Sequence, residues 1–223
     1  MDGILLIDKP SGMTSHDVVD FIRRKFHIKR VGHSGTLDPM ATGLLIILLG
    51  RATKFSKMFA ELDKEYEATL TLGESTDTQD AQGKTVFKSD IEGLDENQIN
   101  EGFLRFKGEI EQIPPMVSAI KYKGKRLYEL ARKNQIVPRQ PRKVRIYKLE
   151  ITKIDLPRVD FHIVCSKGTY IRTLCEDIGK GLGCGGHLSR LIRTRIGPYT
   201  LTEAVSLDKV SVDNGSYLRF REF

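Results

Sequence analysis

The spacing of apolar residues along this chain predicts strands and helices. Residues 3–7 and 44–49 are short, continuous apolar runs, which are typical of strands buried on both faces. Between these runs, Thr14 or Ser15 can cap a helix whose apolar positions recur at helical spacing. A second helix is expected over residues 52–62, directly after the second apolar run.

Other segments alternate between apolar and polar residues, or carry residues that are typical of the start of a helix. Residues 66–72 and 159–165 alternate between apolar and polar positions, which predicts half-buried strands. Asp95 and Gln98 have the spacing of a capping box that opens a helix, and residues 170–182 follow a helical pattern. Strands and helices do not alternate regularly, which favours an α+β fold over a doubly wound sheet.

The composition favours an acidic partner. The 223 residues include 36 Lys and Arg against 29 Asp and Glu, a net charge of +7. Such a balance is common in proteins that bind polyanions, although proteins that bind nothing acidic also carry it. The three cysteines are odd in number and far apart, which argues against a disulfide framework and fits a reducing cytoplasm. The first residues lack the basic segment of a signal peptide and the longest apolar block is too short for a membrane span, so a soluble protein is expected.

Residues 121–148 form a basic segment with interleaved aromatic residues. They contain eleven Lys or Arg residues and a single acidic residue, Glu129. Tyr122, Tyr128 and Tyr147 lie among the cations. One interpretation is a solvated charged face, and the other is a protruding arm that follows the phosphates of an RNA and stacks on its bases. The asymmetry of charge and the tyrosines favour the arm.

One carboxylate stands in an unusual place. Asp38 lies within the glycine-bracketed segment 32–43, which leads directly into the apolar run at 44–49. Desolvation beside a buried strand disfavours the charged form of a carboxylate, so a chemical role is one interpretation. The other is that Asp38 and Pro39 only start a turn. These residues alone leave both interpretations open.

The motifs of common cofactors are incomplete. Residues 83–85 resemble the end of a phosphate-binding loop, but Thr78 stands where that loop requires glycine. Cys184 and His187 have the spacing of half a zinc site, with no second pair to complete it. No cofactor and no metal is therefore expected.

Several motifs, taken in order, resemble the TruB family of pseudouridine synthases. They are residues 8–15 (DKPSGMTS), 32–43 (GHSGTLDPMATG), 63–66 (DKEY), 114–119 (PPMVSA) and 167–174 (KGTYIRTL). Each is rare, and their order and spacing agree with that family from about Gly3 to Tyr199. The resemblance implies an α+β pseudouridine synthase fold, in which helices flank a mixed, largely antiparallel sheet with an active cleft across its middle.

The resemblance also implies an activity. The family isomerises the uridine at position 55, in the T-loop of tRNA, to pseudouridine. The glycosidic bond breaks, the base turns and C5 rejoins the ribose, so no oxidation state changes and no cofactor is required. A stand-alone, cytoplasmic RNA-modifying isomerase is expected, with the tRNA T-arm as its partner and no membrane or obligatory protein partner.

Three residues match catalytic positions of the family. Asp38 matches the catalytic aspartate, which could attack the sugar, attack the base, or remove a proton from the ribose. Arg172 matches the arginine that pairs with this aspartate and keeps it ionised. Tyr66 matches the tyrosine that stacks on the target base, where its hydroxyl is a candidate relay for the C5 proton.

Three further residues match positions that hold the substrate. His33 matches the residue that fills the space left when the uridine flips out of its stack, while Tyr170 and Leu191 match positions in the base pocket. Lys9 is expected to shape the first strand without a catalytic role. Asp80 matches an acidic loop of the family, and no role is assigned to it.

The resemblance predicts a single catalytic domain over residues 1–223, including the basic arm at about 121–148. Family members usually carry a C-terminal PUA domain, but too little sequence follows Tyr199 for one, so none is expected. Two other functions remain open: a guide-RNA-dependent subunit that needs partner proteins, and a non-catalytic RNA-binding or RNA-folding protein. The presence of Asp38, Tyr66 and Arg172 together argues against the second, because binding alone would not require all three.

Overall fold

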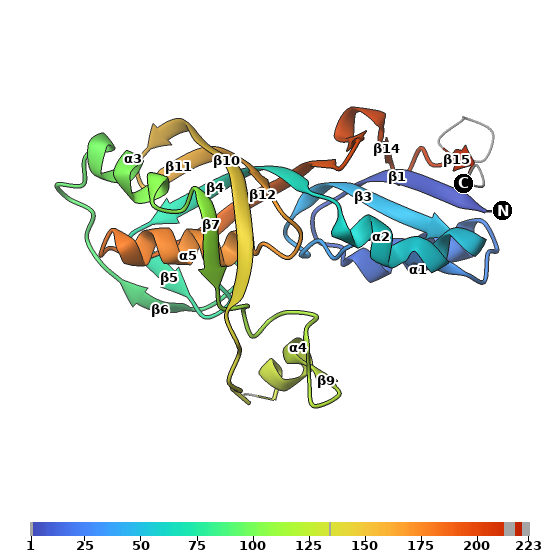
Figure 1. Cartoon of the computed structure of the whole chain (residues 1–223), viewed down its shortest axis with the longest axis horizontal. Helices are drawn as coiled ribbons and strands as arrows, with labels where there is room; N and C mark the ends of the chain where they lie inside the picture. The colour runs from blue at the N-terminus through green and yellow to red at the C-terminus, as the bar shows by residue number, and fades with distance from the viewer. Residues whose placement is uncertain (1, 134, 212–216, 220–223) are drawn as a thin grey trace. The chain divides into compact units, whose positions relative to one another are not determined.

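The computed structural model describes residues 2–133, 135–211 and 217–219. The chain divides into two compact units, Met1–Tyr66 with Leu191–Phe223, and Glu67–Arg190. Two strands, β4 (Lys64–Leu72) and β12 (Gly186–Ile196), run from one unit into the other, and Figure 1 shows the elements of both. Each unit is described in turn.

The sheet of the first unit is built on a long antiparallel pair. Strand β1 (Gly3–Lys9) pairs with β3 (Thr42–Leu49) along its whole length. The strand order is β14-β1-β3-β12, and β12 joins β3 in parallel at Arg193 and Gly43. The smaller strands are β2 (Val31–His33) beside β3, β13 (Tyr199–Thr200) beside β12, and β14 (Val205–Ser206) and β15 (Tyr217–Arg219) beside β1.

Both faces of this sheet are buried. Leu5, Ile7 and Ile47 lie in one core, where Val18 and Ile22 of helix α1 (Ser15–Lys25) pack against them. The alternate residues of β1 and β3 pack on the other side against Ala52 and Phe59, from the 3₁₀ helix η1 (Gly50–Phe55) and the helix α2 (Ser56–Glu61). Because both faces are covered, residues 44–49 show no polar alternation. A second 3₁₀ turn, η2 (Leu201–Glu203), precedes β14.

The sheet of the second unit has the order β12-β4-β11-β10-β7. Its strands β7 (Gly108–Gln112), β10 (Arg142–Asp155) and β11 (Arg158–Cys165) are paired antiparallel, and β5 (Glu74–Thr76) forms a separate hairpin with β6 (Thr85–Lys88). Helices α3 (Glu96–Leu104) and α5 (Ile171–Gly181) complete this unit. The rings of Phe103 and Phe161 join α3 to β11, with 5.3 Å between their centroids.

The basic arm leaves the sheet of the second unit between β7 and β10, as Figure 1 shows. It contains a two-residue hairpin of β8 (Lys121–Tyr122) and β9 (Lys125–Arg126), followed by helix α4 (Leu127–Ala131). Residues 142–148 of the predicted arm lie in β10 instead, because Val144 and Ile146 are buried between the exposed cations. The part outside the sheet therefore ends at Pro141.

Most of the elements expected from the sequence are confirmed. The strands at 3–7, 44–49, 66–72 and 159–165 are present, and so is the helix at 170–182. Of the two candidate caps of the first helix, Thr14 is the N-cap and Ser15 is the first helical residue, while Asp95 and Gln98 form the expected capping box. The helix expected at 52–62 is split into η1 and α2, while β12 was not predicted. Among the helices of the described ranges, none is long and apolar enough to cross a membrane.

Candidate active site

Asp38 lies in the loop that joins β2 to β3, and its neighbours are fixed by hydrogen bonds on both sides. Leu37 is buried, and its backbone N–H donates to Ser15 Oγ at 2.8 Å while its carbonyl accepts from the same hydroxyl at 3.2 Å. Pro39 accepts from the backbone N–H of Gly12 at 2.8 Å. The half-buried carboxylate therefore projects from a backbone held to the start of α1.

Two buried cations contact the backbone of the same loop. Lys9 Nζ, at the end of β1, donates to the carbonyls of Met13 at 2.7 Å and Pro39 at 3.3 Å. Arg193 Nε, on β12, donates to the carbonyl of Leu44 at 2.7 Å. Buried charges are costly unless their donors find acceptors, and both cations meet this condition with backbone carbonyls. Both cations bring positive charge to the backbone next to Asp38.

The pKa of Lys9 reflects this environment. Burial lowers it from 10.5 to about 8, and the charge of Arg193 acts in the same direction, whereas the carboxylate of Asp38 raises it. Lys9 is therefore mostly protonated at pH 7. The opposite charges of Lys9 and Asp38 therefore stabilise each other.

The other predicted residues of the first unit lie on strands. His33 ends β2, and its Nδ1 accepts a hydrogen bond of 3.3 Å from the backbone N–H of Gly35, three residues before Asp38. Tyr66 on β4 and Leu191 on β12 are buried, with 7% and 6% of their surface exposed. Four of the six predicted site residues thus belong to one compact unit.

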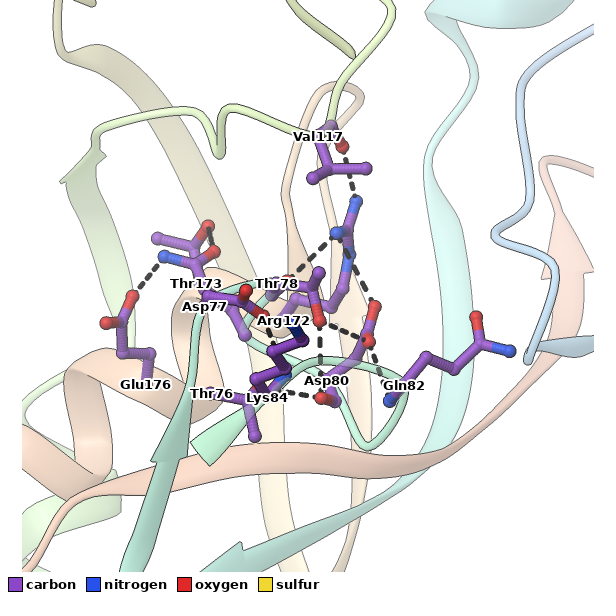
Figure 2. Close-up of polar contacts among 11 residues, drawn as sticks. Thr76, Asp77, Thr78, Asp80, Gln82, Lys84, Val117, Arg172, Thr173 and Glu176 are labelled. Atoms are coloured by element: carbon purple, nitrogen blue, oxygen red, sulfur yellow. Dashed lines mark hydrogen bonds and ion pairs between the residues drawn. The ribbon is translucent and has the colours of Figure 1, made fainter. Parts of the chain in front are cut away.

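Arg172, on α5 in the second unit, is the centre of a buried polar network (Figure 2). Its guanidinium donates to the carbonyls of Val117 at 2.9 Å and Thr78 at 3.1 Å. It also lies 3.5 Å from a carboxylate oxygen of Asp80, and the two side chains are 4% and 7% exposed. Removing one partner of such a buried pair typically costs about 3–5 kcal/mol, because the remaining charge stays buried.

Asp80 is held in a tight loop. Its Oδ1 accepts from the hydroxyl of Thr78 at 2.7 Å and from the backbone N–H of Gln82 at 3.0 Å, and Figure 2 shows these contacts beside Arg172. The same loop includes Gln79 at φ 65°, a region that non-glycine residues rarely adopt. The Gln79 side chain accepts from Thr173 Oγ1 and contacts Glu176, which anchors the loop on α5.

Tyr170, directly before α5, is positioned through its backbone. Its N–H donates to Gln112 Oε1 at 3.0 Å, and its carbonyl accepts from Gln112 Nε2 at 3.2 Å. Gln112 is 2% exposed, so this double contact joins the end of β7 to the start of α5. The buried amide of Gln112 therefore fixes the backbone directly before the helix that carries Arg172.

Within each unit, the structure adds residues that the motifs did not single out. Arg193 was not considered, because an arginine in a strand with alternating polarity gives no sign of full burial. Asp80 was noted without a role, and its ion pair with Arg172 becomes visible only once the 76–83 loop lies against α5. Asp38 and Arg172 belong to different units, and their pairing stays a prediction.

Comparisons with known proteins agree with this geometry. A family model described as "TruB family pseudouridylate synthase (N terminal domain)" matches residues 23–171, and one described as "tRNA pseudouridylate synthase B C-terminal domain" matches residues 172–219. A protein of Opitutus terrae named tRNA pseudouridine synthase B is 49% identical over 94% of this chain and 87% of its own length. A protein of that name from Burkholderia pseudomallei is 51% identical over 93% of this chain and 68% of its own length.

Solved structures show the same fold. The chain superimposes on a structure titled "Crystal Structure of a Cbf5-Nop10-Gar1 Complex" with a TM-score of 0.73 and 33% identity, covering 92% of this chain. It spans about half of the matched chain, 52%. A structure titled "Crystal structure of the archaeal box H/ACA sRNP Nop10-Cbf5 complex" gives a TM-score of 0.68 at 32% identity, again covering 92% of this chain and 51% of the other.

The mixed, largely antiparallel sheet and the motif residues define a pseudouridine synthase, a class of isomerases. Since the N-terminal family model alone covers more than half of the sequence, this chain belongs to the TruB family of pseudouridylate synthases. The fold class expected from the sequence is confirmed.

Proposed function

We propose that this chain converts the T-loop uridine of tRNA, at position 55, to pseudouridine as a stand-alone and cofactor-free enzyme. The observation that supports this best is the Asp38 loop, whose backbone on both sides of the half-buried carboxylate accepts hydrogen bonds from the buried cations Lys9 and Arg193. The family match and the tRNA pseudouridine synthase B names of its relatives support tRNA as the substrate. Such a substrate would place the enzyme in the cytoplasm.

In this proposal Asp38 is the reacting group. Its carboxylate must be ionised to attack the ribose or the base, or to remove a proton, and the charge of Lys9 favours the ionised form. Tyr66 would stack on the base, and Arg172 would pair with Asp38 and keep it ionised, as the family resemblance implies. His33, Tyr170 and Leu191 would hold the flipped nucleotide, whose removal from its stack costs about a few kcal/mol.

A second candidate is a guide-RNA-dependent subunit, which the likeness to the Cbf5 chains of box H/ACA complexes makes worth testing. Identity to the relatives named tRNA pseudouridine synthase B is 49–51%, against 32–33% for those chains. The difference favours action on tRNA without a guide. The first proposal, action on tRNA as a stand-alone enzyme, requires no obligatory protein partner.

The test is tritium release from T-arm RNA labelled at C5 of uridine, with the purified chain alone. We expect release by the natural sequence, and a loss of at least about 1,000-fold in Asp38→Asn, because the amide cannot act as nucleophile or base. RNA affinity, measured with the same RNA, should change by less than about threefold because the amide keeps the size of the side chain. Asp90→Asn, an exposed loop carboxylate, is the matched control.

Two results would contradict the proposal. Turnover of Asp38→Asn close to that of the natural sequence would remove Asp38 from the reaction. No release by the natural sequence, with RNA binding intact, would favour the guide-dependent subunit or a non-catalytic RNA-folding protein.

A further inference from the structure

Arg193 is one of the largest fully buried side chains in the described part of this protein, with 1% of its surface exposed. It lies on β12, two residues after Leu191, and its register partner on β3 is Gly43. The two backbones approach closely here, since a Cβ placed on Gly43 would lie 2.4 Å from the Arg193 carbonyl oxygen. Arg193 is thus held against the strand that follows the Asp38 loop.

The guanidinium of Arg193 reaches both ends of the loop. Nε donates to the carbonyl of Leu44, after Asp38, at 2.7 Å. Nη2 and Nη1 contact the carbonyls of Gly35 and Thr36, before Asp38, at 3.4 and 3.5 Å. The contact after Asp38 is short and strong, whereas those before it are long and more easily lost.

Arginine suits this task better than any other side chain. Its planar guanidinium carries five donors in a fixed fork and can reach several carbonyls in different directions at once. A lysine could keep the charge, but its three donors all leave one nitrogen, so it cannot reproduce the spread of the guanidinium between Leu44 and the Gly35–Thr36 backbone. An apolar side chain would leave the carbonyl of the buried Leu44 without this donor.

We propose that Arg193 is a positioning residue, whose guanidinium joins the Gly35–Thr36 backbone to Leu44 and thereby sets the direction of Asp38. This inference rests on the proposed role of Asp38. In it, Arg193 never touches the substrate and acts only through the loop. A residue with a general structural role would instead affect folding and RNA binding together with the rate.

The experiment compares Arg193→Lys with Arg195→Lys as its matched control. Arg195 is an arginine of the same strand, but it pairs with Glu65 and the carbonyl of Gly197, away from the loop. Three quantities are measured for each folded variant: the single-turnover rate of pseudouridine formation, the Kd for T-arm RNA, and amide hydrogen exchange over residues 35–37. The Leu37 N–H, which donates to Ser15, is the most informative amide.

We expect Arg193→Lys to lower the single-turnover rate at least about tenfold, to change Kd by less than about threefold, and to speed exchange at residues 35–37. Arg195→Lys should stay within about twofold of the natural sequence in rate and exchange. If Arg193→Lys does not fold, Arg193→Gln takes its place, because its uncharged and shorter amide can donate to one carbonyl but cannot reach Leu44 and the Gly35–Thr36 backbone together; the same three changes are expected.

Other outcomes overturn the inference. A rate within twofold of the natural sequence, or unchanged exchange at residues 35–37, means that Arg193 does not position the loop. Equal losses of rate and RNA affinity, with faster exchange throughout β3 and β12, mean a general structural role. If the natural sequence itself forms no pseudouridine, the proposed function has failed, and the exchange comparison alone decides whether Arg193 holds the loop.

Discussion

At the scale of single residues, the buried cations of the candidate site have hydrogen-bond acceptors within the protein. Lys9 and Arg193 direct their donors at backbone carbonyls, and Arg172 combines carbonyls with the carboxylate of Asp80. In each case the charge is buried with acceptors already in place, which limits the cost of removing it from water. Such groups do not need to rearrange when substrate arrives, and this favours a preorganised site.

Asp177 is a carboxylate on α5 without this compensation. It lines a cavity of about 490 Å³ in the second unit together with Thr76, Met116, Arg139 and Lys180. Burial raises its pKa from 3.8 to about 6, Glu176 acts in the same direction, and Lys180 only partly opposes them. The folded protein therefore holds the Asp177 proton to a higher pH than the unfolded chain does.

Because the pKa of Asp177 is higher in the folded protein than in the unfolded chain, ionising this carboxylate lowers the stability of the fold. The cost of ionising Asp177 is absent below about pH 4 and complete above about pH 6. Asp177→Asn should therefore raise the free energy of unfolding at pH 7 by about 1 kcal/mol, a value reduced because solvent reaches this half-buried side chain. The gain should vanish at about pH 4.

Urea denaturation at the two pH values measures this difference. Glu101→Gln, an exposed carboxylate on α3, is the control, and we expect it to change stability by less than about 0.5 kcal/mol at both. A gain of equal size at pH 4 and pH 7 would show that the Asp177 carboxylate is not the cause.

At the scale of elements, the contact between β3 and β12 depends on one glycine. Gly43 has φ +100°, and its missing Cβ leaves room for the Arg193 backbone. Gly12 also has a positive φ, +86°, but a Cβ there would meet nothing within 4 Å. Comparing alanine substitutions at the two glycines therefore separates the cost of a left-handed backbone from the cost of a steric clash.

Gly43→Ala should lower the free energy of unfolding by about 3 kcal/mol or more, because the strands must separate to admit the methyl group. Gly12→Ala should cost only about 1–2 kcal/mol, the penalty of a left-handed backbone. Urea denaturation of both variants tests this order. Equal costs for the two would mean that the close approach of β12 contributes nothing.

At the scale of the whole molecule, the excess of seven positive charges is the property that bears on RNA binding. In the arm, Arg126 and Arg132 lie over the ring of Tyr128, and Lys123 over that of Tyr122. Cations held near aromatic rings can contact phosphates while the rings offer stacking surfaces. The arm should therefore contribute a large share of the salt dependence of binding.

We expect the double variant Lys123→Gln and Lys125→Gln, in the β8–β9 hairpin, to make the plot of the log association constant against log salt concentration less steep by about 1–2. The matched control is Lys153→Gln with Arg158→Gln, two exposed cations at the turn of the β10–β11 hairpin. Filter binding of T-arm RNA between about 50 and 200 mM salt measures both slopes. Equal reductions would mean that the net charge, and not the arm, determines binding.

Local pattern alone determined several features of this protein. The apolar strand at residues 44–49, the capping boxes at Thr14 and Asp95, and the alternation at 159–165 depend on neighbouring residues. The family motifs singled out Asp38 and Arg172 for the same reason, since each motif is a short continuous segment. Such features can be predicted because their physical cause lies within a few residues along the chain.

Only the tertiary structure decided the surroundings of those residues. Arg193 is 155 positions after Asp38, and it meets the loop because β12 returns in parallel beside β3. Asp80 pairs with Arg172, and Gln112 holds Tyr170, through loops and strands far apart in sequence. Burial, and with it the cost and the strength of each charge, depends on what the folded chain places around a side chain. The sequence therefore determined which groups are candidates for the chemistry, and the fold decided how they are held.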